Sequence, residues 1–86
     1  MKYNLSVGNK TFEITESGYT LAKQLADSNY ELPAVISFQE LPHSKDHTQR
    51  WLNHFFAFGV LNYEAVNSQT FRLLSLNKDF ELFITN

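Results

Sequence analysis

The sequence predicts an α+β fold in a single domain of 86 residues. Apolar residues alternate with polar ones near both ends of the chain, which is the spacing of strands with one buried face. Between these ends, two segments repeat apolar residues at intervals of three and four, which is typical of amphipathic helices. The chain has no internal repeat and no linker rich in proline or glycine, so we expect no domain boundary within it.

The first expected element is a β-hairpin. Apolar and polar residues alternate over positions 3–7 and again over 11–15. Gly8 and Asn9 separate the two runs, and a glycine–asparagine pair favours a tight hairpin turn.

A helix should follow the hairpin. Ser17 is the expected N-cap, because its hydroxyl can accept a hydrogen bond from a free amide of the first turn. Leu21 and Leu25 stand one helical turn apart, and the helix is expected to run to about Ser28. Asn29 is expected to end it.

The segment over 32–41 has two interpretations. In the first, 34–36 is a short buried strand, and 37–40, which has the S-x-x-E form of a capping box, begins a helical turn. Pro42 would then stop this turn. In the second, one strand runs over 34–38.

The strongest helical pattern lies over 44–58. Ser44 is a suitable N-cap, and Asp46 suits the positive end of the helix dipole. Gly59 falls where a left-handed C-cap favours glycine. The apolar stripe of this helix is assigned to the core and consists of Trp51, Leu52, Phe55, Phe56 and Phe58.

The rest of the chain reads as strands. Runs over 63–66 and 70–76 flank a polar tip at 67–69, as in a second hairpin. A last strand over 80–85 should pair either with the N-terminal hairpin or with a second subunit, because a bare apolar edge invites association.

Composition excludes several classes of protein. Seven basic and nine acidic residues give a net charge of −2, which argues against a protein that coats nucleic acid but permits a local positive face. The absence of cysteine excludes disulfides and thiolate metal sites. No signal peptide and no apolar run of about 18 residues is present, so a cytoplasmic location is the default expectation.

Enzyme motifs are also missing. The chain has no glycine-rich phosphate loop, no G-x-S-x-G, no H-E-x-x-H and no cysteine nucleophile, and its acids are scattered. We therefore expect no catalytic site and no cofactor.

The three histidines offer a metal hypothesis. His43 and His47 have the i,i+4 spacing that can bind zinc, but His54 lies two turns further on, too far to be a third ligand. We expect no metal site. Histidines that titrate between about pH 5 and 8 could instead strengthen anion binding in acid.

The polar side of the 44–58 segment carries the most suggestive chemistry. It presents mainly amides, imidazoles and a guanidinium. Arginine can bond guanine with two hydrogen bonds, and asparagine or glutamine can bond adenine in the same way. Positive or potentially positive charge also gathers here, from His43, Lys45, His47, Arg50 and His54.

The order of elements resembles a winged helix-turn-helix domain over roughly residues 18–76. The residues that carry the resemblance are Ile36-Ser37-Phe38-Gln39-Glu40-Leu41, Ser44-Lys45-Asp46-His47-Thr48-Gln49-Arg50-Trp51-Leu52 and Gly59-Val60-Leu61. The stretch from 37 to 52 is about one helical turn shorter than is usual in that family, because Pro42 truncates the first helix of the pair. The resemblance implies a winged-helix-like core with an N-terminal β-hairpin and an extra C-terminal strand. The alternative is one antiparallel sheet packed against two helices.

The resemblance also implies a function. The chain would be a small sequence-specific DNA-binding protein, a transcriptional regulator that acts as a homodimer with the 44–58 helix in the major groove of double-stranded DNA. Gln49, Arg50 and Asn53 would read bases; Ser44, Lys45, Thr48 and His54 would contact phosphates or base edges; Asn67, Ser68, Gln69 and Arg72 would form the wing contact.

The alternative function is a protein-binding adaptor or inhibitor, for example of mobile-element origin, without nucleic-acid contact. The slightly acidic charge and the 15% of aromatic residues favour it, because tryptophan and tyrosine are enriched at protein interfaces.

Overall fold

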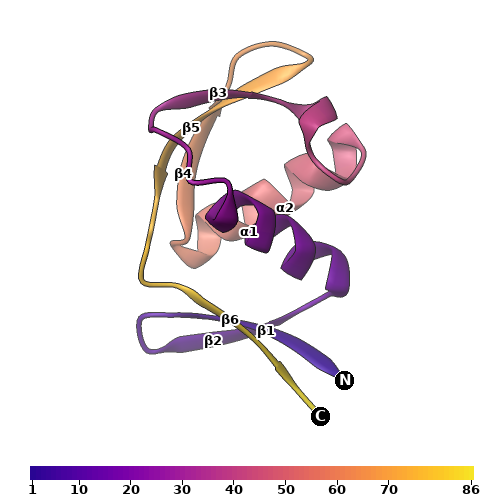
Figure 1. The fold of residues 1–86 in the computed structure, drawn as a ribbon, viewed down its shortest axis with the longest axis vertical. Coiled ribbons are helices and arrows are strands. Elements are labelled where there is room, and N and C mark those ends of the chain that lie inside the picture. The colour runs from indigo at the N-terminus through magenta and orange to yellow at the C-terminus, as the bar shows by residue number, and fades with distance from the viewer.

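Two helices lie between two three-stranded antiparallel sheets in the structure, a computed structural model that describes all 86 residues (Figure 1). One sheet has the strand order β2-β1-β6 and the other β3-β5-β4. Along the chain the elements are β1 (Lys2–Val7), β2 (Lys10–Ile14), α1 (Glu16–Asp27), β3 (Ala34–Ser37), the 3-10 turn η1 (Phe38–Glu40), α2 (Lys45–Phe58), β4 (Leu61–Ala65), β5 (Thr70–Leu76) and β6 (Glu81–Thr85). The α+β prediction is confirmed. The strands form two sheets rather than the single sheet of the alternative.

The N-terminal hairpin forms as predicted. Gly8 adopts a positive φ of 60° in the turn between β1 and β2, a conformation that glycine reaches without steric cost. Leu5 pairs with Phe12 on one side and with Leu82 of β6 on the other, so β1 is the central strand of its sheet. Of the two partners expected for the last strand, the structure therefore shows the N-terminal hairpin.

Helix α1 covers the predicted segment but begins at a different cap. The hydroxyl of Thr15, not of Ser17, accepts the amide of Gly18 at 3.3 Å. The predicted cap at Ser17 is wrong because Ser17 already lies in the first turn, where it faces α2. Asn29 follows the helix with a φ of 55°, which fits its predicted role at the helix end.

The segment after α1 follows the first of its two interpretations. β3 ends at Ser37, whose hydroxyl accepts the amide of Gln39 at 3.2 Å, and the 3-10 turn begins there. A single strand through Phe38 is wrong: the Phe38 ring turns inward and packs on Phe71, with the ring centroids 5.1 Å apart.

Helix α2 has both predicted ends. The Ser44 hydroxyl accepts the amide of His47 at 3.3 Å, and Gly59 takes the left-handed conformation with φ 86°. The Val60 amide then donates to the carbonyl of Phe55 at 2.9 Å, which satisfies one of the last free carbonyls.

The apolar stripe of α2 differs from the prediction at one residue. Leu52 and Phe55 are fully buried, and Trp51 and Phe58 are half-buried. Phe56 was assigned to the core and is 53% exposed. The buried side of the helix is centred on Thr48, Leu52 and Phe55, and Phe56 lies well round the helix from that centre.

The second sheet contains the other hairpin. β5 has its predicted bounds, whereas β4 begins two residues earlier than predicted and is irregular between Asn62 and Tyr63. The inner face of β5 supplies Phe71 and Leu73 to the core, and both are fully buried against the layer of helices. On the opposite side of the helices, Phe12 of β2 stacks on Phe58 with a centroid distance of 4.0 Å. No helix is long and apolar enough to cross a membrane.

Candidate functional site

The outward side of α2 is the candidate site. Because Thr48, Leu52 and Phe55 point into the core, the opposite arc of the helix faces solvent. The exposed side chains of α2 are Lys45, Asp46, Arg50, Asn53, His54, Phe56 and Ala57, and Gln49 is half-buried at the edge of this arc. Of the three predicted base readers, Arg50 and Asn53 are exposed in the structure.

Arg50 is a cation of this surface without an acidic partner. The structure contains three ion pairs, Lys2 with Glu13, Lys23 with Asp27 and Arg72 with Glu64, and Arg50 belongs to none of them. Lys45, five residues before it, extends over the ring of Phe38 at 5.8 Å from the centroid. These two side chains and the carboxylate of Asp46 are the charged groups of α2.

Asn53 is held by the neighbouring hairpin. The hydroxyl of Tyr63, on β4, donates a hydrogen bond to its Oδ1. The amide nitrogen of Asn53 stays free, and Oδ1 keeps a second lone pair. Burial raises the pKa of the Tyr63 hydroxyl above the ordinary value of 10.0, so the proton that makes this bond is retained.

Tyr63 should make the free energy of unfolding depend on pH in alkaline solution. A raised pKa in the folded state means that the unfolded chain loses the proton first, so the stabilisation is complete below about pH 10 and declines as the pH rises through the folded pKa. We expect the difference in unfolding free energy between wild type and Tyr63→Phe to shrink above that pH, as measured by urea denaturation. Tyr30→Phe, which removes a hydroxyl that makes no side-chain hydrogen bond, is the control. A difference that stays constant with pH would contradict the role given to Tyr63.

Thr48 is a correction to the predicted site. It was expected to contact a phosphate or a base edge, but it is fully buried. Its hydroxyl donates to the carbonyl of His43 at 3.4 Å within the protein. A hydroxyl satisfied in this way can lie on the core side of a helix, and it cannot reach a ligand outside.

The predicted wing divides into two parts. Asn67, Ser68 and Gln69 are exposed at the tip, where the Oδ1 of Asn67 accepts the amides of Gln69 and Thr70 at 2.8 and 2.9 Å. Arg72 is not at the tip. It lies within β5 between the inward-pointing Phe71 and Leu73, so its side chain leaves the sheet on the face opposite α2.

Arg72 is also held in place by a carboxylate. Glu64, opposite it on β4, forms an ion pair with its guanidinium. The structure therefore does not bring Arg72 together with the outward side of α2.

Two of the three histidines connect the helices to each other. The Nε2 of His43 donates to the carbonyl of Ser17 at 2.9 Å, and the Nε2 of His47 lies 2.9 Å from the Ser17 hydroxyl. Their rings meet edge to face at 4.9 Å. His54 is the one exposed histidine, and no group of three or more side chains is placed to hold a metal ion.

Sequence reasoning missed two residues of this surface. Phe56 was counted in the core, and Tyr63 was given no partner. The signal for Phe56 was its helical angle relative to Leu52 and Phe55, but the position of Tyr63 depends on the irregular pairing of β4.

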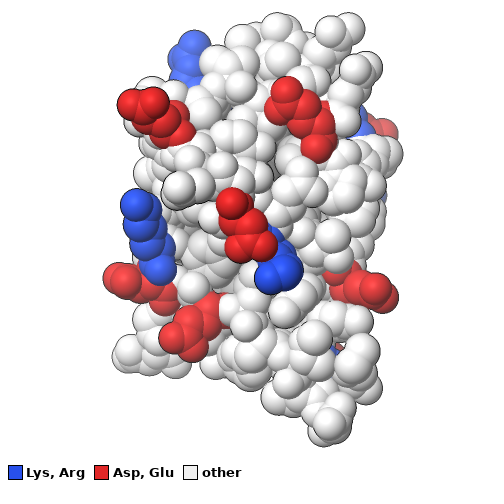
Figure 2. All heavy atoms as spheres, in the orientation of Figure 1, with Lys and Arg blue, Asp and Glu red and all other residues white.

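The face of the molecule drawn in Figure 2 carries charges of both signs. Figure 2 shows mostly acidic groups and isolated basic ones on the face in view, without a continuous positive patch.

Comparison with protein-family models, with curated proteins and with solved structures gave no match to this chain.

Proposed function

We propose that this chain is a winged-helix DNA-binding protein, a small sequence-specific transcriptional regulator whose α2 enters the major groove of double-stranded DNA. The observation that carries this proposal is the outward side of α2, where Arg50 is exposed and unpaired one turn before the exposed His54 and three residues before Asn53. The major groove, about 12 Å wide, admits an α-helix.

The order and pairing of the elements support a winged-helix-like core. α1, β3, the turn η1, α2 and the β4–β5 hairpin follow one another, and β5 lies between β3 and β4. η1 stands where that family has the first helix of the helix-turn-helix pair, and it is reduced to a single 3-10 turn. The N-terminal hairpin and β6 form a separate sheet outside this core.

The side chains of α2 suit base recognition better than phosphate binding. A free guanidinium can make two hydrogen bonds to guanine. Asn53 can offer its amide nitrogen and the second lone pair of Oδ1 to adenine, and Tyr63 restricts the orientation of its amide. Tyr63 would therefore orient the amide of Asn53 before DNA binds.

Phosphate contacts would be few. Lys45 and Arg50 are the cations on α2, and Arg72 is occupied by Glu64. With Arg50 bound to a base, Lys45 is the one cation of α2 left for a phosphate, and one such contact gives a slope of about −1 in a plot of log affinity against log salt concentration. We therefore expect binding that is measurable at low salt, with a shallow salt dependence.

Three variants test the proposal. Arg50→Ala should relax base preference and weaken binding to the preferred duplex roughly 5- to 150-fold, the range that one bidentate base contact contributes. Lys45→Ala should weaken binding to all sequences and reduce the magnitude of the salt slope by about 1. Lys10→Ala, at the start of β2, removes the same charge far along the chain from α2 and should change neither property.

The measurement is an electrophoretic shift with a pool of random duplexes at low salt, followed by sequencing of the bound fraction. If wild-type protein shifts no duplex under these conditions, the DNA-binding proposal is wrong. If Arg50→Ala and Lys10→Ala have the same effect, α2 is not the reading element.

A protein partner is the second candidate function. Phe56 is 53% exposed and borders a shallow hollow with Leu61 and Leu76. Exposed aromatic side chains beside such a hollow are typical anchors of protein interfaces. This candidate would be favoured if the wild-type protein shifts no DNA duplex but retains a partner protein in a pull-down.

A further inference from the structure

The two sheets leave four edge strands, and three of them are protected. An open edge presents unpaired amides and carbonyls, with which a strand of another chain can pair. Charged side chains, irregular pairing and a short strand prevent this. β2 carries Lys10 and Glu13 within five residues. β4 carries Glu64 and an irregular pairing beside Asn62, and β3 is four residues long and directly follows Pro33.

The fourth edge, β6, has none of these protections. Its pairing with β1 is regular over five residues, it contains no proline, and Glu81 at its start is its one charged residue. Phe83 and Ile84 are 37% and 45% exposed, on opposite faces of the strand.

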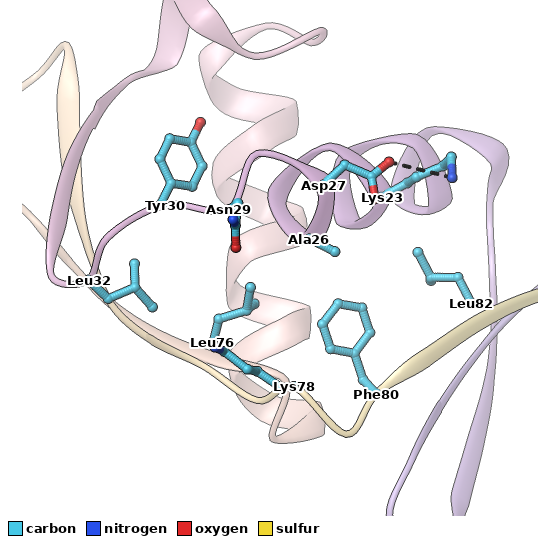
Figure 3. A pocket seen from close by; sticks show the side chains of 10 residues that line it. All are labelled: Lys23, Ala26, Asp27, Asn29, Tyr30, Leu32, Leu76, Lys78, Phe80 and Leu82. Atoms are coloured by element: carbon cyan, nitrogen blue, oxygen red, sulfur yellow. Dashed lines mark ion pairs between the residues drawn. The ribbon is translucent and has the colours of Figure 1, made fainter.

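No other element closes over this edge. α1 packs on the inner face of the sheet, yet a pocket of about 330 Å³ remains between the C-terminal half of α1 and the start of β6. Figure 3 shows Leu82 and Phe80 on one side of this pocket and Ala26 of α1 on the other. The inner side of β6 is therefore open as well as its edge.

We infer that β6 binds β6 of a second copy of this chain. Two copies related by a two-fold axis perpendicular to the sheet can pair their β6 strands antiparallel, centred on Phe83. This register places Glu81 opposite Thr85, Leu82 opposite Ile84, and Phe83 opposite Phe83 of the second copy. The result is one six-stranded sheet with the strand order β2-β1-β6-β6-β1-β2.

The composition of β6 favours a second copy as its occupant. In this register no two like charges lie opposite each other, because Glu81 meets a threonine. Leu82 and Ile84 of both copies form one continuous apolar row on the inner face, which covers the exposed Ile84. Phe83 of each copy gains an aromatic partner on the outer face. The strand is thus complementary to itself.

This inference stands apart from DNA binding. It depends on the lower sheet in Figure 1, whereas the DNA proposal depends on α2, so either can fail while the other holds. It also gives the homodimer expected from the sequence a specific interface.

The mass of the full chain in solution tests the inference. Light scattering coupled to gel filtration should give about 20 kDa, twice the 10.0 kDa of one chain. Phe83→Lys places two lysines directly opposite each other and should weaken the dimer by roughly tenfold or more, since opposed like charges are destabilising. Thr11→Lys, on the outer face of the protected β2 edge, should leave the mass unchanged.

A cross-link tests the register itself. The chain has no cysteine, so a single Phe83→Cys variant can form a disulfide only between copies. Residues directly opposite each other across two strands are close enough for that bond. We expect Phe83→Cys to cross-link under mild oxidation and Thr11→Cys to stay monomeric on a denaturing gel. A monomer of 10 kDa at high protein concentration, a dimer that Phe83→Lys leaves intact, or equal cross-linking of the two variants would each overturn the inference.

Discussion

Replacing Phe55 by alanine is expected to lower the free energy of unfolding by roughly 3–5 kcal/mol, the usual cost of removing a fully buried aromatic side chain. Phe55 has no exposed surface and lies at the centre of the buried side of α2. Its ring packs against Trp51, with the centroids 5.5 Å apart. Domains of this size are stable by only about 5–15 kcal/mol, so the variant should be close to unfolding at physiological temperature.

The neighbouring residue provides the control. Phe56 is the same type of residue on the same helix and is 53% exposed, so Phe56→Ala should cost much less than Phe55→Ala. Urea denaturation followed by circular dichroism measures both. Equal losses at the two positions would show that α2 is rotated relative to the arrangement described above.

Gly18→Val is expected to destabilise the domain by roughly 1–3 kcal/mol through overpacking. A Cβ at Gly18 would lie 2.8 Å from two ring carbons of Trp51, closer than side-chain carbons normally approach. Valine has a better helix propensity than glycine, so the substitution also brings a gain of a few tenths of a kcal/mol. The steric term is the larger of the two.

A double-mutant cycle separates these two terms. Gly18→Val should cost less in a Trp51→Leu background, because leucine leaves room for the added methyl groups, whereas the propensity gain is the same in both backgrounds. Thermal unfolding of the four proteins supplies the measurement. If Gly18→Val costs the same with either residue at position 51, the contact between α1 and Trp51 is not what requires glycine.

Local signals made most of the fold predictable. The glycine–asparagine turn, the cap at Ser44 and the left-handed Gly59 act within a few residues of their own positions, and the structure has all three. The turn at Ser37 was also one of the two stated alternatives. In each case the residue type restricts the backbone or satisfies a nearby amide without help from the rest of the chain.

The errors concern residues whose environment other elements decide. Thr48 is polar, and the winged-helix resemblance made it a surface contact, but the carbonyl of His43 satisfies its hydroxyl inside the protein. Phe56 is apolar and was assigned to the core. It is nevertheless exposed, because Leu52 and Phe55 occupy the side of α2 that faces the core. Hydrophobicity alone could not show which of these two side chains is buried. The side of the helix that faces the core is a property of the whole fold.

The candidate site was predictable to a similar extent. The exposure of Arg50 and Asn53 follows from the helical spacing of the apolar residues. The bond from Tyr63 to Asn53 and the pairing of Arg72 with Glu64 do not, because both depend on how β4 aligns with its neighbours.

The pairing of β1 with β6 has a consequence for how the protein folds during synthesis. Lys2 aligns with Thr85, so β1, the central strand of its sheet, is made before the other elements described here, and its neighbour β6 is made after all of them. A hairpin alone is marginally stable in water, and contacts this distant in sequence form slowly. During synthesis this sheet therefore stays unfinished until β6 has left the ribosome, and Leu5 gains its second neighbouring strand only then.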